Sequence, residues 1–340
     1  MTTITDPLFA GLFDKTITAI PADVAKQRYM TSVAPMAANP GKWVEQPRLP
    51  IPTGEHAVIE CQGRIHIVAG YARHRVDGNF HQVFDSKSGQ WSLKAEFPTP
   101  CNHVAGVAIG SKVYTFGGFI EQNRCPHSLC YVYDTATDKW SRIASLSRPR
   151  GAISAVALDG KIHLLGGRDV RSVEWHEVYD PATDKYEDRA SMRGSTMTQP
   201  FVGQRDHMGV VVADGLIYAI AGRMDSYDFN TSLNAVYDPK KDSWGFRAPL
   251  PTARSGPSAV FIGGKIVVFG GEATGKVFGT NEGYDPKTDT WEQLTPMAIP
   301  RHGLHGATVA VIGNMVHVPG GGPIPGGRIQ GAYHDAFTFG

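Results

Sequence analysis

Residues Tyr133–Trp140 read YDTATDKW, and four other stretches of the chain repeat this phrase with small changes. Each copy opens with an aromatic residue and an aspartate and closes with an aromatic ring: FDSKSGQW (84–91), YDTATDKW (133–140), YDPATDKY (179–186), YDPKKDSW (237–244) and YDPKTDTW (284–291). An apolar segment ending in glycine precedes every copy, and a sixth such segment ends at Gly321. The glycines recur at intervals of about 50 residues, the length of a β-propeller blade made of four short strands. The repeat therefore predicts an all-β propeller.

The two ends of the chain decide the number of blades. The sixth unit stops at AFTF (336–339), without the aspartate and the tryptophan. Trp43 supplies the missing tryptophan, because its distance from Thr53 equals the distance from Trp91 to Cys101. The N-terminal segment is then the outermost strand of the last blade, and this pairing closes the ring and removes its free edges. We predict a six-bladed propeller over residues 41–340, preceded by an N-terminal arm over residues 1–40.

Most residues of the repeat have a structural explanation. The double glycine lets a strand end in a tight turn where a side chain would clash. The tyrosine and the tryptophan fill the space between neighbouring blades, and the aspartate with its turn residues connects the two outer strands. With this combination the chain resembles the Kelch-repeat proteins, which are β-propellers. The resemblance implies that the repeat residues make the fold and that function lies elsewhere.

Composition limits the kinds of partner. The formal net charge of +1 argues against nucleic-acid or membrane-surface binding driven by bulk electrostatics. No run approaches the roughly 20 apolar residues of a membrane-spanning helix, and the N-terminus lacks the basic opening of a signal peptide. The four cysteines show no zinc-binding spacing and are expected to be reduced thiols. We therefore expect a cytoplasmic protein without nucleic-acid or membrane partners.

Candidate functional residues gather where the blades meet the axis. In a propeller, the loop entering each innermost strand and the loop joining the second strand to the third lie on one face. The predicted catalytic residues come from the entry loops: His56, His103, His207 and His305, with Glu55 and Asp206. The predicted substrate-binding residues come from both kinds of loop: Arg150, Arg205, Arg254, Arg301, Arg73, Arg168, Arg223, Trp175 and Tyr227. Together they predict an ionisable pocket for a small-molecule ligand at the axial face.

A structural role competes with each of these assignments. Kelch repeats commonly open the inner strand with a proline–arginine–x–glycine–histidine phrase, in which the arginine braces a neighbouring loop and the histidine satisfies carbonyls. The segments at Arg150, Arg254 and His302 resemble this phrase. Counted from the glycines, His103 and His207 align, whereas His56 is one place later and His305 one place earlier. Adjacent positions on a strand point to opposite sides, so two or three of the histidines are expected to face the channel.

The first functional hypothesis is an enzyme that uses general acid–base chemistry on a small, polar, anionic molecule. Histidine titrates near neutral pH, so two imidazoles can donate and accept protons in turn. The arginines would hold a carboxylate through bidentate bonds, and Glu55 or Asp206 would orient an imidazole. From residue 43 onward the chain is similar to the six-bladed Kelch sialic-acid mutarotases, which interconvert sugar-acid anomers. This likeness implies an isomerase, mutarotase or lyase type of reaction on a sugar acid or a comparable carboxylate.

Two other hypotheses use the same face. Two or three neutral imidazoles with Glu55 or Asp206 would suit iron, zinc or manganese, which leaves a divalent metal open as cofactor and a metal-dependent lyase or hydrolase as an alternative. The glutamate–aspartate–histidine spacing of plant specifier proteins, which are iron-binding Kelch propellers, is not found. The third hypothesis is a non-catalytic protein-interaction module, because many Kelch proteins present this face to a peptide. The long connection Glu187–Arg205 is a candidate lid over the site.

Overall fold

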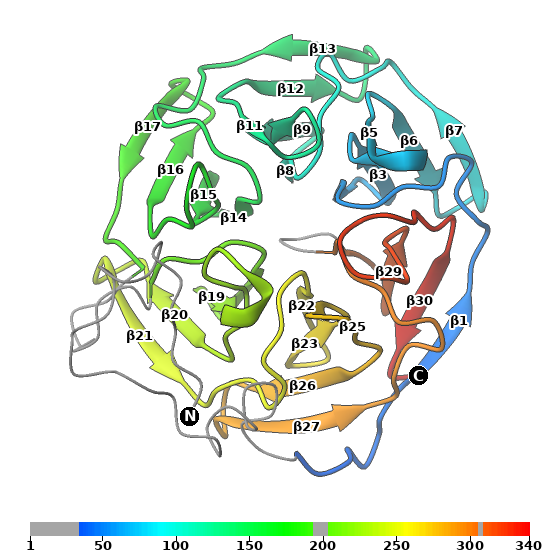
Figure 1. Ribbon diagram of the computed structural model, residues 1–340, viewed down its shortest axis with the longest axis vertical. Coiled ribbons are helices and arrows are strands. Elements are labelled where there is room, and N and C mark those ends of the chain that lie inside the picture. Colours follow the sequence, from blue (N-terminus) through cyan, green and yellow to red (C-terminus); the bar gives the residue numbers. More distant parts are fainter. Residues whose placement is uncertain (1–33, 193–202, 305–308) are drawn as a thin grey trace.

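The structure is a computed structural model that describes residues 34–192, 203–304 and 309–340. Six four-stranded antiparallel sheets stand around a central axis like the blades of a fan (Figure 1). Regular structure in the described residues consists of short strands and two 3-10 turns, η1 (Arg73–Arg75) and η2 (Tyr227–Phe229). This architecture confirms the predicted six-bladed propeller.

The strands of each blade run from the axis outward, and their bounds follow in that order. Blade 1 has β2 (Ala57–Cys61), β3 (Arg64–Val68), β6 (His81–Asp85) and β7 (Gln90–Leu93). Blade 2 has β8 (Ala105–Ile109), β9 (Lys112–Phe116), β12 (Cys130–Asp134) and β13 (Lys139–Arg142). Blade 3 has β14 (Ser154–Leu158), β15 (Lys161–Leu165), β16 (His176–Asp180) and β17 (Lys185–Asp188).

The other three blades follow the same plan. Blade 4 has β18 (Gly209–Ala213), β19 (Leu216–Ile220), β20 (Asn234–Asp238) and β21 (Ser243–Arg247). Blade 5 has β22 (Ser258–Ile262), β23 (Lys265–Phe269), β26 (Asn281–Asp285) and β27 (Thr290–Leu294). Blade 6 has β28 (Ala310–Ile312), β29 (Met315–Pro319), β30 (His334–Thr338) and β1 (Lys42–Glu45). Short hairpins join the second and third strands of blades 1, 2 and 5: β4 (Tyr71–Ala72) with β5 (Val76–Asp77), β10 (Phe119–Ile120) with β11 (Cys125–Pro126), and β24 (Glu272–Ala273) with β25 (Lys276–Val277).

The N-terminal strand closes the ring. In Figure 1 the blue strand β1 lies beside the red strand β30, and Trp43 pairs with Phe337 in their antiparallel register. The Trp43 indole donates to the Thr295 carbonyl of blade 5 over 3.0 Å, as the repeat tryptophans do between other blades. Part of the predicted arm, residues 34–40, lies along β27, where the Gln293 amide donates to the Pro35 carbonyl over 2.8 Å. Residues 1–33 lie outside the described part.

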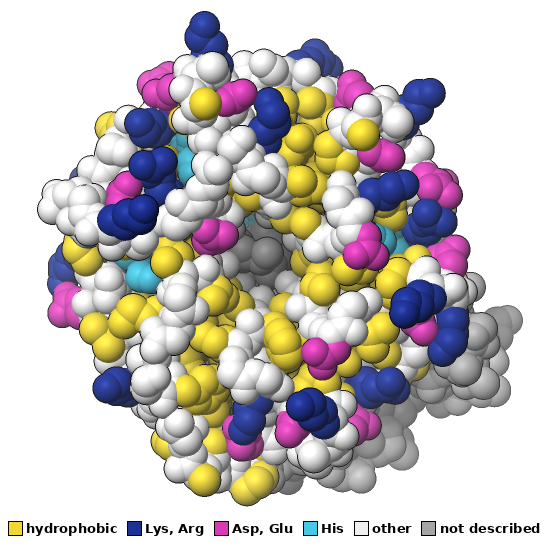
Figure 2. All heavy atoms as spheres, turned by 180° about the vertical axis from the view of Figure 1, so that it is seen from behind, with side chains coloured by type: hydrophobic (Ala, Val, Ile, Leu, Met, Phe, Trp, Pro, Cys, Tyr) yellow, Lys and Arg dark blue, Asp and Glu magenta, His cyan; other side chains and the backbone are white. Residues whose placement is uncertain are grey.

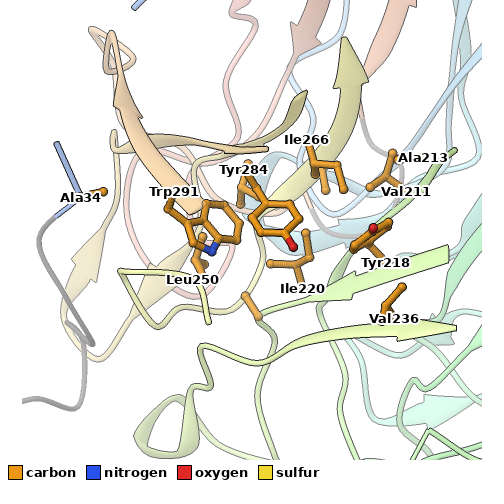
Figure 3. Close-up of a cluster of buried hydrophobic side chains, with 13 residues drawn as sticks. Ala34, Val211, Ala213, Tyr218, Ile220, Val236, Leu250, Ile266, Tyr284 and Trp291 are labelled. Carbon is orange, nitrogen blue, oxygen red and sulfur yellow. The ribbon is translucent and has the colours of Figure 1, made fainter. Parts of the chain in front are cut away.

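The repeated phrase holds neighbouring blades together through its second aspartate. Tyr284 donates to Asp289 over 2.6 Å, and the same carboxylate accepts the backbone amide of Ala248, in the preceding blade, over 2.8 Å. The Trp291 indole donates to the Ala248 carbonyl over 2.8 Å. Figure 3 shows the rings of Tyr284 and Trp291 in the cluster that contains Ile220 and Tyr218 of blade 4. The phrase therefore joins neighbouring blades by hydrogen bonds, in addition to forming a turn and packing aromatic rings into the core.

The remaining surface features concern the back of the ring. Seen from behind, the molecule is hollowed at its centre, and Lys and Arg side chains alternate with Asp and Glu around the rim (Figure 2). This mixture of both signs agrees with the formal net charge of +1. Within the described residues, every helix is too short and too polar to cross a membrane.

Candidate functional site

A ring of six residues surrounds the axis, one at the start of each innermost strand. We call it the axial ring: Glu55, His103, Ala152, His207, Gly256 and Gly303, all with left-handed backbone and φ between 52° and 72°. Backbone bonds tie neighbours together, since the His103 amide donates to the Glu55 carbonyl over 2.8 Å and the Ala152 amide to the His103 carbonyl over 3.0 Å. The sequence predicted the alignment of His103 with His207, and the structure adds Glu55 to that register.

Three members of the axial ring carry ionisable side chains at a conformational cost. Left-handed backbone costs a residue with a side chain roughly 1–2 kcal/mol, whereas glycine adopts it freely. Glu55, His103 and His207 are nevertheless buried there, each at most 3% exposed. One carboxylate oxygen and one ring nitrogen from each histidine lie within 4.8 Å of one another. Strain of this kind collects at functional sites, so the axis is the candidate site.

A second set of contacts positions these side chains. The residue before each member of the axial ring forms a β-bridge with the residue after the second glycine of its blade: Gly54–Tyr71, Asn102–Phe119, Gly151–Arg168, Asp206–Arg223, Ser255–Glu272 and His302–Gly322. We call these the bridge pairs. Because each blade repeats the geometry, the side chains of the bridge pairs surround the axial ring.

His103 and Glu55 form an acid–base pair. The Asn102 amide nitrogen donates to Asp77 over 2.6 Å, which turns the Asn102 oxygen toward Nδ1 of His103. Nδ1 must then carry a proton, because an amide oxygen only accepts. The other ring nitrogen, Nε2, lies 3.2 Å from Glu55 Oε2. One proton held between these two atoms makes the contact favourable, and the pair can donate or accept it.

His207 is held in a defined neutral tautomer. An arginine only donates hydrogen bonds, and Nη2 of Arg223 lies 3.0 Å from Nε2 of His207, so this nitrogen accepts. The opposite nitrogen, Nδ1, donates to Asp206. Burial alone would raise the pKa of Asp206, but His207 and Arg223 lower it well below its usual range. Asp206 therefore stays ionised and orients the imidazole, with help from the Ser172 hydroxyl, which donates to its other oxygen.

His302 is the cationic histidine of this network. Its Nδ1 lies 3.2 Å from Glu272 Oε2 and 3.4 Å from Glu55 Oε1, and its Nε2 donates to the Ile324 carbonyl over 2.7 Å. Burial alone would lower the pKa of His302, but Glu272 and Glu55 raise it to about 9. The imidazolium therefore carries its charge at neutral pH and links the two carboxylates.

Charges nearly balance at the axis. Glu55, Asp206 and Glu272 are acidic, and Arg223 and His302 are cationic; Arg223 contacts Asp206 over 3.1 Å and Glu272 over 3.3 Å. The proton between His103 and Glu55 compensates the remaining negative charge. The low dielectric of a buried site strengthens the contacts of such a hydrogen-bonded network.

The four entry-loop arginines do not reach this network. Each is fully buried inside its own blade. Arg150 pairs with Glu177 over 2.5 Å, Arg254 with Glu282 over 2.7 Å and Arg301 with Asp335 over 2.6 Å. Arg205 donates to the carbonyls of Ala219, Ala221 and Leu233. These contacts fit the bracing role rather than the predicted substrate-binding role.

The other predicted residues divide between the axis and the rim. Arg223 is central, and its guanidinium lies 4.3 Å from the ring centre of Tyr227. Arg168 lies over Phe119, and His56 donates to the Pro319 carbonyl over 3.2 Å, away from the acid–base pair. Trp175 stacks against Arg148 at 4.4 Å in blade 3. Arg73 lines a separate cleft. His305 and residues 193–202 of the candidate lid lie outside the described residues.

Sequence reasoning left Glu272, His302 and Asn102 out of the predicted site. Glu272 directly follows the second glycine of its blade, in the same position as Arg223. His302 and Asn102 directly precede axial-ring residues, in the same position as Asp206. For Glu272 and Asn102 the signal was their equivalence to residues already chosen. For His302 counting gave no such signal, because it placed His305 in that position, and only the bridge between His302 and Gly322 reveals the equivalence.

Comparison with known proteins agrees with this six-fold architecture. The model of the KLHDC2/KLHL20/DRC7 Kelch-repeats domain matches residues 55–246, and the Kelch motif matches residues 253–298. The chain belongs to the Kelch-repeat family.

Individual relatives match only in part. Kelch-like protein 35 of Mus musculus is 30% identical over 80 residues, which is 24% of this chain and 14% of the relative. Beta-scruin of Limulus polyphemus is 38% identical over 72 residues, 21% of this chain and 8% of the relative. A solved structure described as "Structure of YjhT" superimposes with a TM-score of 0.69 at 15% identity, over 86% of this chain and 95% of that one. At that identity the likeness concerns the fold alone.

Proposed function

We propose that the axial network is the reaction site of an enzyme that moves protons on a small, anionic molecule. The observation that carries the proposal is the strained backbone of Glu55, His103 and His207, three residues from different blades whose side chains meet at the axis. Blades 5 and 6 meet this backbone requirement with Gly256 and Gly303 and blade 3 with Ala152, so the backbone alone does not require an ionisable side chain. The side chains present are those that general acid–base catalysis needs.

Each residue has a role that follows from its contacts. Arg223 is the anion-binding group, since a carboxylate offers it bidentate bonds in place of its contact with His207. That exchange releases Nε2 of His207 as a base, while Asp206 keeps the imidazole oriented. The proton between His103 and Glu55 supplies the acid. His302 remains charged and stabilises negative charge on Glu55 after that proton leaves. Two-sided proton transfer of this kind serves an isomerase, a mutarotase or a lyase.

Glycine variants of the axial ring provide the test. His103→Gly and His207→Gly remove the imidazoles while easing the left-handed backbone, and Ala152→Gly makes the same backbone change without removing a functional group. Wild-type protein is incubated in D2O with pooled sugar acids, lactones and other carboxylates, and NMR follows anomer exchange and deuterium incorporation. We expect turnover of one pool member by the wild type and by Ala152→Gly, and loss of at least about 100-fold in either histidine variant.

Two results would contradict this function. Equal activity in His103→Gly, His207→Gly and Ala152→Gly would remove the histidines from the chemistry. The interaction-module hypothesis would be favoured instead by two findings together. No member of the pool is turned over or raises the unfolding temperature, and a protein partner binds the chain stoichiometrically.

A metal-dependent reaction is the second candidate function, and the donor set favours it. Glu55, His103 and His207 offer one carboxylate oxygen and two imidazole nitrogens within 4.8 Å, a set that suits zinc, iron or manganese. Asn102 and Asp206 accept from Nδ1 of the two histidines, as partners of metal-bound histidines do. A bound metal would act as a Lewis acid toward the substrate. Arg223 fits this function less well, because it occupies Nε2 of His207 and must turn away first.

Metal content separates the two candidates. Protein purified without chelator is analysed for zinc, iron and manganese, and titrated with each ion. Stoichiometric metal that is lost in His207→Gly but kept in Ala152→Gly would favour the metal-dependent reaction. Turnover that survives chelation would favour proton transfer by the side chains alone.

A further inference from the structure

A second cleft lies on the propeller at the seam where the ring closes. It has a volume of about 550 Å³, within the range of small-molecule sites. Its walls come from blade 1 and blade 6, the light-blue and red blades of Figure 1: Ile51, Pro52, Ala72, Arg73, His74, Arg328, Ile329 and Gln330. The Thr53 amide donates to the Gly331 carbonyl over 3.1 Å, which fixes the spacing of the two walls.

The basic side chains that line this cleft have no carboxylate partner within ion-pair distance among the described residues. Arg73, His74 and Arg328 are exposed, and none of them forms an ion pair with a carboxylate among the described residues. Their neighbour Arg75 is engaged differently, since it donates to the Tyr71 hydroxyl over 3.3 Å and lies over that ring. Two unopposed arginines from different blades create a positive potential inside one concave surface.

The turn that carries Arg73 and His74 contains strained backbone. His74 and Arg75 are consecutive left-handed residues, with φ of 62° and 59°, inside turn η1. Neither residue is glycine, so the turn is held in a conformation that its residue types disfavour. The opposite wall is anchored by Gln330, whose amide donates to the Gly327 carbonyl over 2.6 Å. Arg73, next to this turn, and Arg328, between Gly327 and Gln330, both line the cleft.

The rest of the lining is apolar. Ile329 is 51% exposed, and Ile51, Pro52 and Ala72 complete the surface between the charges. An exposed isoleucine in a cleft gains from contact with an apolar group, whereas a simple hydrated anion would leave it in water. The site therefore combines anion recognition with a hydrophobic contact.

We propose that this seam cleft binds a small molecule that carries a carboxylate or phosphate group on an apolar body. Arg73 and Arg328 take the anionic group, and Ile51 and Ile329 contact the body. None of the residues that line the cleft belongs to the axial network, although the segment that carries Arg328 adjoins it, since the Gly326 amide donates to Glu272 over 3.1 Å. Binding here therefore does not depend on the proposed reaction at the axis.

Calorimetric titration of the full chain tests the proposal. The probes are phenyl phosphate, phenylacetate, inorganic phosphate and uncharged benzyl alcohol. We expect saturable binding of an aromatic anion, at least about tenfold weaker binding in Arg73→Ala and in Arg328→Ala, and weaker binding in Ile329→Ser. The stronger of the two aromatic anions identifies the preferred group.

Two variants serve as controls. Arg124→Ala removes an exposed arginine from the corresponding loop of blade 2 and should bind like the wild type. His207→Gly disables the axial network and should also retain binding, so a failure at the axis remains distinct from a failure at the seam. The proposal is overturned if neither aromatic anion saturates at millimolar concentration, if Arg328→Ala binds as well as Arg124→Ala, or if inorganic phosphate binds as tightly as phenyl phosphate.

Discussion

Buried histidines occupy two regions of this propeller, and the two groups behave in opposite ways. Between blades, three pairs link the second strand to the third: His66 with His81 over 2.9 Å, His163 with His176 over 2.8 Å, and His317 with His334 over 3.0 Å. At the axis, His103, His207 and His302 lie among carboxylates. Both groups are almost completely excluded from water.

The neighbours of a histidine, and not its burial, decide the difference. Burial lowers the pKa of His66 to about 4 and that of His81 to about 3, and the uncharged rings of Tyr133 and Trp140 of the next blade pack against His81. At the axis, burial acts in the same direction on His302, but the carboxylates of Glu272 and Glu55 outweigh it. The pairs are therefore neutral core elements, and His302 is a charged one.

The largest expected effect comes from removing an axial carboxylate. Asp206→Ala leaves Arg223 and Nδ1 of His207 without their acceptor in a buried site, so we expect the free energy of unfolding to fall by about 3–5 kcal/mol. His176→Asn is the matched change between blades, because blades 4 and 5 carry Asn234 and Asn281 at that strand position. It should cost about 1–2 kcal/mol. Denaturant unfolding measures the loss in the free energy of unfolding for each variant. A larger loss in His176→Asn than in Asp206→Ala would contradict the contrast between the two regions.

The next effect is a two-sided dependence of stability on pH. The paired histidines have folded pKa values below the unfolded value, so their contribution is complete above about pH 6.5 and is lost as the pH falls toward 4 and 3. His302 has a folded pKa raised to about 9, so its contribution is complete below about pH 6.5 and is lost as the pH rises through 9. We call the loss of stability at low pH the acid arm and the loss at high pH the alkaline arm. In each arm the free energy of unfolding should fall by a few kcal/mol, on the order of 1.4 kcal/mol per pKa unit.

Variants separate the acid arm from the alkaline arm. His163→Tyr with His176→Asn gives blade 3 the residues found at the same positions of blade 4, Tyr218 and Asn234. Thermal unfolding between pH 3.5 and 10, with the wild type in parallel, should show a shallower acid arm and an unchanged alkaline arm. His302→Gln should flatten the alkaline arm alone. Identical profiles for both variants would show that the two histidine regions do not differ in charge.

The fold could be predicted from the sequence because each blade repeats the same local signals. Glycine at Gly70 and the phrase that ends at Trp91 act through turn geometry and ring packing, which depend on nearby residues. The displaced strand β1 was found for the same reason, since Trp43 keeps the blade spacing. Six glycine-ended segments and five copies of the phrase leave little room for another topology.

The site was predicted only in part, because its contacts join different blades. Counting from the glycines matched His103 with His207. Glu55 was predicted as a catalytic residue, but it was not recognised as the third member of that register. The bracing arginines could not be told from ligand-binding ones, since the partners of Arg150 and Arg254 are glutamates on the third strand of the blade. The histidine pairs depend on which residues face each other across two strands. Such pairings become visible only once the register is known.

The smallest expected effect concerns the two glycines of the axial ring. It tests which carboxylate distinguishes His302 from the paired histidines. A Cβ at Gly256 would meet its nearest neighbour at 3.6 Å, so Gly256→Ala costs only the left-handed strain, roughly 1 kcal/mol. A Cβ at Gly303 would lie 3.0 Å from the Glu55 carboxylate carbon and 3.1 Å from its amide nitrogen, so Gly303→Ala must also displace Glu55. We expect Gly303→Ala to be the less stable of the two in denaturant unfolding.

Displacing Glu55 withdraws one of the carboxylates that raise the pKa of His302, so the alkaline arm should move to lower pH in Gly303→Ala and stay in place in Gly256→Ala. The acid arm should be the same in both variants, because the histidine pairs lie between blades and do not contact Glu55. If both alanine variants shift the alkaline arm equally, the charge of His302 does not depend on Glu55, and Glu272 alone distinguishes this histidine from the paired ones.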